Sequence, residues 1–151
     1  MNAILSNFRI SGTFSLMLVT ALMASVLFIS TANSDSDNIA IEGYDTVAYF
    51  MAQRATRGSK DISYQWNGLI WYFSSIENKK QFIADPKKFA PQFNGFCANG
   101  LSDGHAIEAN PENWRIIDGK LYLFFSDYGR SKWSGNVKPL IESANETLKN
   151  Q

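Results

Sequence analysis

The chain of 151 residues contains one cysteine, Cys97, and one histidine, His105. A single cysteine excludes a disulfide within the chain, so the fold depends on its packed core. Cysteine and histidine are the side chains that most often bind zinc or copper, so the chain has few candidate ligands for these metals. A lone cysteine is buried, reactive, metal-binding or paired with another molecule. Which of these applies to Cys97 is the main functional question that the sequence poses.

The chain also lacks an excess of charge of either sign, because its 14 lysines and arginines balance its 14 aspartates and glutamates. The chain has no long basic run, so we do not expect nucleic acid as a partner. It also has no nucleophile elbow, phosphate-binding loop or paired-carboxylate motif. Cys97 with His105 and Asp45 is the one trio that could supply a nucleophile and a base. We therefore expect a protein that is not an enzyme, with a Cys97-based activity as the minority alternative.

The start of the chain has the pattern of a secretory signal peptide. Residues 1–13 carry one positive charge and no acid, residues 14–29 are almost wholly apolar, and Ser30-Thr31-Ala32 supplies small residues at a cleavage site. We expect a periplasmic or secreted protein. The alternative is an uncleaved membrane anchor, because the apolar run is only slightly shorter than a membrane span. The predicted division is a signal peptide over 1–32, a polar linker over 33–38 and one domain over 39–151.

Two turn dipeptides predict two β-hairpins. Asn67-Gly68 lies between alternating apolar residues over 64–73, and Asp118-Gly119 lies between similar arms over 114–125. Both dipeptides accept the positive φ that a two-residue hairpin turn requires. The second arm, 121–125, is apolar on both faces, so we expect it at the centre of a sheet.

Helix start signals follow both hairpins. Ser74 with Glu77 three residues later forms a capping box, which predicts a helix from about Ser75 to Asp85, before Pro86. Ser126 or Asp127 can cap a second short helix, and Pro139 suits the first turn of a last one. The fold class is therefore α+β, a small antiparallel sheet of hairpins covered by short helices.

The remaining segments lack such clear signals. We expect two short extended pieces around a turn over 39–50, an exposed loop over 53–63 and a long loop over 98–113. The inward positions of the predicted strands and helix should form one core. These positions are Trp71, Phe73, Phe82, Trp114, Leu121 and Leu123.

Three runs carry a family resemblance: IAIEGYDTVAYF (39–50), WNGLIWYFSSIENKKQFIADPKKFAPQFNGFCANG (66–100) and IIDGKLYLFFS (116–126). In order and spacing they resemble the extracytoplasmic branch of the YHS-domain family. The resemblance covers nearly all of the chain after residue 38. It implies a small α+β module, and several relatives in that family bind metals through cysteines.

The chain departs from those metal-binding relatives at the ligand positions. Ser74 and Asn78 stand where the relatives carry the two cysteines of a YFC-x-x-x-C type motif, and Trp66 stands where a histidine often lies. Thr46 replaces the proline that usually follows GYD, which we expect to loosen the turn. The resemblance therefore implies the fold more firmly than it implies a metal site.

Four residues are the candidates for a site. Tyr44 and Asp45 of the GYD sequence are candidate cofactor-binding residues, although an aspartate beside a turn more often caps backbone amides. Cys97 and His105 are candidate metal ligands, because a thiolate and an imidazole together suit copper or zinc, and the thiolate favours Cu(I). Met51, a backbone carbonyl, a water or a second chain would have to complete the coordination.

These patterns predict an extracytoplasmic YHS-like module that binds a transition metal, with copper favoured, or a small ligand near Cys97. Gly95 and the Asn99-Gly100 turn favour a partly accessible thiol. The alternative is a non-catalytic accessory or interaction domain with no metal, in which Cys97 is buried beside Phe93 and Phe96. In that case Cys97→Ser should destabilise more than Cys97→Ala, because a buried hydroxyl has no guaranteed partner.

Overall fold

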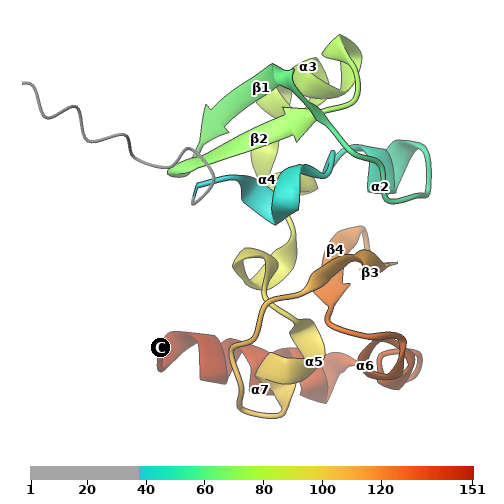
Figure 1. Ribbon diagram of the computed structural model, residues 1–151. Coiled ribbons are helices and arrows are strands. Elements are labelled where there is room, and N and C mark those ends of the chain that lie inside the picture. Colours follow the sequence, from blue (N-terminus) through green and yellow to red (C-terminus); the bar gives the residue numbers. More distant parts are fainter. Residues whose placement is uncertain (1–37) are drawn as a thin grey trace, which may run out of the picture. The chain divides into compact units, whose positions relative to one another are not determined.

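The computed structural model describes residues 38–151. The predicted signal peptide, its cleavage site and most of the predicted linker lie outside this part. The described elements form an α+β fold, as predicted, and none of their helices is long and apolar enough to cross a membrane (Figure 1). With η for a 3-10 helix, they are η1 (Ala40–Gly43), α2 (Ala48–Met51), β1 (Ser59–Trp66), β2 (Leu69–Phe73), α3 (Ile76–Ala84), α4 (Pro86–Phe89), η2 (Gln92–Gly95), α5 (Ala98–Ser102), β3 (Asn110–Ile117), β4 (Lys120–Phe124), α6 (Asp127–Lys132) and α7 (Lys138–Lys149).

Both predicted hairpins are confirmed. β1 pairs with β2 and β3 with β4, each antiparallel, in two separate two-stranded sheets. Asn67 and Gly68 have φ of 52° and 79°, and Asp118 and Gly119 have φ of 50° and 73°, as a two-residue turn of this hand requires. The expectation that the last strand lies at the centre of a sheet is wrong, because within residues 38–151 β4 has only β3 as a ladder partner, apart from one isolated bridge between Leu123 and Cys97.

Serines cap the helices that follow the hairpins. Ser75 Oγ accepts a hydrogen bond from the Asn78 amide at 3.1 Å, and Ser126 Oγ accepts one from the Gly129 amide at 3.4 Å. The predicted helix starts are therefore confirmed, but the cap of α3 is Ser75 rather than Ser74. Ser74 is free to bond elsewhere, which matters for the site.

The order of elements is repeated along the chain. A 3-10 turn, a short helix, a hairpin and a serine-capped helix occur over residues 40–84, the first repeat, and again over residues 92–132, the second repeat (Figure 1, cyan to green and yellow to orange). Each first strand contains one register shift. Each 3-10 turn has three successive residues with positive φ: Ile41, Glu42 and Gly43 in the first, and Phe93, Asn94 and Gly95 in the second.

Three segments differ from the sequence-based expectation. Residues 48–51 are helical rather than extended, because the Asp45 carboxylate accepts the amides at the start of α2. The loop expected over 53–63 ends at Ser59, where β1 begins. The long loop expected over 98–113 contains α5 and the start of β3.

The predicted single core is divided. Trp71, Phe73 and Phe82 pack in one cluster, whereas Leu121 and Leu123 pack with the tyrosines at positions 44 and 49 in another. Trp114 is only partly buried beside the second cluster. The first cluster lies within the first repeat and α4, whereas the second joins tyrosines of the first repeat to β4 of the second. A third cluster lies under α7 and contains Cys97, Leu101, Trp133 and Ala144.

Tyr49 makes one of the contacts between the repeats, since its fully buried hydroxyl donates to the Pro111 carbonyl at 3.0 Å. Burial raises the pKa of Tyr49 well above its usual value. A raised pKa in the folded state means that the stability it contributes is present below the ordinary tyrosine pKa of about 10 and is lost as pH rises above it.

We therefore expect the free energy of unfolding to fall above about pH 10, by up to about 1.4 kcal/mol per pH unit from this one group. Urea unfolding at a series of pH values measures the slope. Tyr49→Phe should flatten it, whereas Tyr128→Phe, which removes an exposed phenol, should leave it unchanged. An identical slope in Tyr49→Phe and the wild-type protein would contradict the assignment.

Candidate functional site

The Asp45 carboxylate is fully buried and accepts hydrogen bonds on both oxygens. Oδ1 accepts from the amides of Val47 at 3.0 Å and Ala48 at 3.4 Å. Oδ2 accepts from the Ser74 amide at 2.8 Å, the Ser74 hydroxyl at 2.6 Å and Asn78 Nδ2 at 2.7 Å. These five donors occupy the carboxylate. The arrangement agrees with the structural alternative for Asp45, in which it fixes the start of α2 against the end of β2.

The same network contains the two residues that stand at the cysteine positions of the expected YHS-type motif. Ser74 and Asn78 both direct a polar group to Asp45 Oδ2. Asn78 Nδ2 also lies 3.4 Å from Ser74 Oγ. The space at this place is therefore filled by a closed hydrogen-bond network rather than by free ligands.

Tyr44 lies beside Asp45 in sequence but serves a different contact. Its hydroxyl donates to Glu112 Oε1 at 2.6 Å, which joins the first repeat to β3. That hydrogen bond is the main cause of a raised pKa at Tyr44. The Arg57 guanidinium lies over the Tyr44 ring, 4.3 Å from its centroid. The turn is also not loosened as expected, since the buried Thr46 hydroxyl donates to a carbonyl at the end of α4.

Cys97 is buried, with 2% of its surface exposed, so the expectation of a partly accessible thiol is wrong. Its sulfur accepts hydrogen bonds from the Gly100 amide at 3.3 Å and the Phe125 amide at 3.1 Å. Cys97 is therefore the N-cap of α5. It packs in the cluster with Phe93, and Phe96 lies against that cluster, as the accessory-domain alternative supposes.

A pocket of about 290 Å³ lies over Cys97, and His105 lines the same pocket. The structure thus brings together the two residues predicted as metal ligands. Three apolar side chains at the pocket stay largely exposed: Ile107 at 42%, Phe125 at 62% and Tyr128 at 72%. They make up half of the large apolar side chains that are exposed in the described part of the chain.

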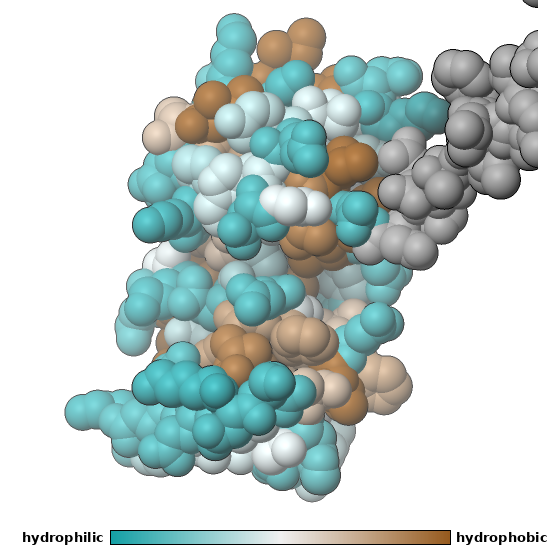
Figure 2. Space-filling model, turned by 90° about the vertical axis from the view of Figure 1, so that its left-hand side faces the viewer, coloured by the Kyte–Doolittle hydropathy of each residue, from teal (hydrophilic) through white to brown (hydrophobic). Residues whose placement is uncertain are grey.

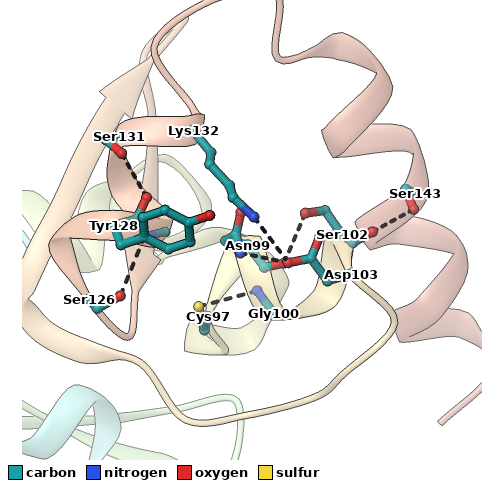
Figure 3. A network of polar contacts seen from close by, with 11 residues as sticks. Cys97, Asn99, Gly100, Ser102, Asp103, Ser126, Tyr128, Ser131, Lys132 and Ser143 are labelled. Carbon is teal, nitrogen blue, oxygen red and sulfur yellow. Dashed lines mark hydrogen bonds and ion pairs between the residues drawn. The ribbon is translucent and has the colours of Figure 1, made fainter.

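The charged groups beside this pocket, Asp103 and Lys132, form an ion pair (Figure 3). Asp103 Oδ2 accepts from Asn99 Nδ2 at 2.8 Å and lies 3.8 Å from Lys132 Nζ. Lys132 Nζ also lies 4.9 Å from the centroid of the Tyr128 ring. The buried Oδ1 of Asn99 accepts no hydrogen bond from the residues that the structure describes. The pocket therefore offers an acceptor and aromatic surface but no free charge from Asp103.

The pocket does not fit a resident copper ion. Over residues 38–151, no group of three or more His, Cys, Asp and Glu side chains could hold a metal. Met51, the extra ligand considered from the sequence, is exposed at the end of α2 and is not among the lining residues. The sulfur of Cys97 is engaged by two backbone amides. Two side chains with one of them so engaged are too few for a stable site.

Sequence reasoning missed the aromatic walls of this pocket. Phe125 was expected inside a strand, but β4 ends at Phe124, so the ring of Phe125 lies outside the ladder. Tyr128 and Gly129 fall in the short helix predicted after Ser126, for which no binding role was expected from the sequence. An aromatic residue next to a serine cap, followed by glycine in the first helical turn, is the signal that could have indicated them. No family model, curated protein or solved structure matches the chain.

The hydrogen bonds of Cys97 reverse the mutational order expected from the sequence. Cys97→Ala leaves the buried amide of Gly100 and the partly buried amide of Phe125 without an acceptor, so we expect a loss of about 1 to 3 kcal/mol in unfolding free energy. Cys97→Ser should lower the free energy of unfolding by less, since serine is a favoured N-cap and its oxygen can accept both hydrogen bonds. Urea denaturation of both variants checks the order. A more stable alanine variant would mean that the sulfur acts only as apolar filling.

Proposed function

We propose that the chain is an extracytoplasmic, non-catalytic module of YHS-like type that binds a small organic ligand in the pocket over Cys97. The observation that carries the proposal is the grouping of exposed Ile107, Phe125 and Tyr128 around that one pocket. Its volume of about 290 Å³ is at the small end of the range for ligand sites. Exposed aromatic groups at a concave place are typical of ligand recognition.

The form of the pocket, and of the one face drawn in Figure 2, favours a small ligand over a large partner. Figure 2 shows one face of the molecule, on which apolar residues (brown) form separate patches between hydrophilic residues (teal). A permanent protein interface normally has a larger continuous apolar centre. The pocket over Cys97, by contrast, combines apolar walls with a few polar groups, as small-molecule sites do.

A panel of small aromatic compounds tests the proposal by amide NMR of the full chain. We expect saturable shifts at the amides of Gly100, Ile107 and Phe125. Tyr128→Ala should weaken binding about tenfold, because it removes one aromatic wall. Ile76→Ala, which removes an equally exposed apolar side chain from α3, is the matched control and should leave binding unchanged.

Two outcomes would contradict the proposal. If no compound gives a saturable shift at these amides, the accessory-domain alternative with a purely structural Cys97 stands. If the protein instead binds Cu(I) with a stoichiometry that Cys97→Ser and His105→Ala abolish, the pocket is a metal site completed by a further ligand, as the sequence first suggested.

A further inference from the structure

The two repeats place a buried acceptor at the same point of their fold. Asp45 and Cys97 each follow a 3-10 turn, and each accepts an amide from the start of the next short helix: Ala48 at 3.4 Å and Gly100 at 3.3 Å. Each also accepts the amide that follows the second strand of its hairpin, from Ser74 at 2.8 Å, 29 positions away, and from Phe125 at 3.1 Å, 28 positions away. Cys97 is thus the counterpart of Asp45.

The repeats differ in what fills the space beside that acceptor. In the first repeat, Asn78 is the residue whose amide bonds the capping Ser75, and its side-chain carboxamide donates to Asp45 at 2.7 Å. In the second repeat, the amide that bonds the capping Ser126 belongs to Gly129, which has no side chain. Gly129 lines the pocket over Cys97. The carboxamide of Asn78 therefore has no counterpart on Gly129, where the nearest side chain is that of Asn99.

We infer that the ligand of this pocket carries a primary carboxamide on a small apolar or aromatic body, seated where the Asn78 side chain lies in the first repeat. This inference rests on the proposed function and names its ligand class. A carboxamide has an N–H donor for the buried, unbonded Oδ1 of Asn99 and a carbonyl oxygen that accepts a hydrogen bond from the Cys97 thiol, whose sulfur already accepts two backbone amides. The rings of Phe125 and Tyr128 cover its apolar body.

The charges around the pocket favour a neutral group over an acid or an amine. Asp103 is already paired with Lys132 and Asn99, so neither charge of that pair is free for an acid or an amine.

Benzamide is the probe, and its matched controls are benzoate and N,N-dimethylbenzamide, which lacks the N–H donors. In an amide NMR titration of the full chain, we expect benzamide to bind about tenfold or more tightly than either control. Gly129→Asn, which supplies the carboxamide from the chain itself, should abolish binding. A Cβ at position 129 would lie 3.3 Å from Asn99 Cβ, so Gly129→Ala serves as a second variant that needs less space and should weaken binding less.

The outcomes separate this inference from the proposed function. Equal binding of benzamide and its controls, or unchanged benzamide binding in folded Gly129→Asn or Gly129→Ala protein, would overturn the carboxamide inference and leave the pocket as a ligand site. If no aromatic compound binds at these amides, both proposals are wrong. The near-ultraviolet circular dichroism of buried Trp133 shows whether each variant keeps its fold.

Discussion

Replacing Asp45 with asparagine is expected to lower the free energy of unfolding by about 3 to 5 kcal/mol, a large part of the stability of a small domain. The substitution keeps the shape but removes the charge that five donors share. It also turns an NH₂ group toward N–H or O–H donors, whichever way the amide is oriented. Buried donors without an acceptor are destabilising, and hydrogen bonds to a charged group are the stronger kind.

Equilibrium denaturation in urea measures this effect, and Asp61→Asn is the matched control. Asp61 is exposed on β1, so the same chemical change there should shift stability by less than about 0.5 kcal/mol. Asp45→Asn with a stability within about 1 kcal/mol of the wild-type protein would show that the network does not hold α2 to the end of β2.

Replacing Phe73 with alanine is expected to lower the free energy of unfolding by a similar amount, about 3 to 5 kcal/mol. Phe73 is fully buried, and its ring centroid lies 5.2 Å from that of Phe82. Truncation removes apolar contacts and leaves a cavity that the surrounding aromatic rings cannot close.

Phe125→Ala provides the matched control, since the same truncation at a side chain that is 62% exposed creates no cavity. Thermal unfolding should show a clear drop in Tm for Phe73→Ala and almost none for Phe125→Ala. Equal Tm values for the two variants would contradict the assignment of Phe73 to the core.

The parts of the fold that the sequence predicts are those set by neighbouring residues. Asn67-Gly68 and Asp118-Gly119 fix their hairpins through backbone preferences within two residues, and Ser126 fixes a helix start through a bond to the third residue after it. The positive φ of Ile41 and Phe93 could not be predicted, because neither residue favours that conformation. Tertiary packing imposes it.

In the candidate site, too, the sequence indicates the chemistry of single residues but not the contacts that tertiary packing sets. Cys97 and His105 were found from chemistry alone, and the structure places both at one pocket. The sequence left the burial of Cys97 as one of two alternatives, because the two donors to its sulfur are the amides of Gly100 and Phe125, and backbone amides carry no sequence signal. The link from Asp45 to Asn78 spans 33 positions and depends on how the hairpin folds back, which periodicity does not report.

Each buried acceptor closes a loop of 28 or 29 residues that lies inside one repeat. The bonds from Tyr49 to Pro111 and from Tyr44 to Glu112 span 62 and 68 positions, so they close much longer loops. Short loops close faster and at lower entropic cost than long ones. We therefore expect the hydrogen bonds to Asp45 and to Cys97 to form early in folding, each within its own repeat. The tyrosine contacts should form later and join the two repeats.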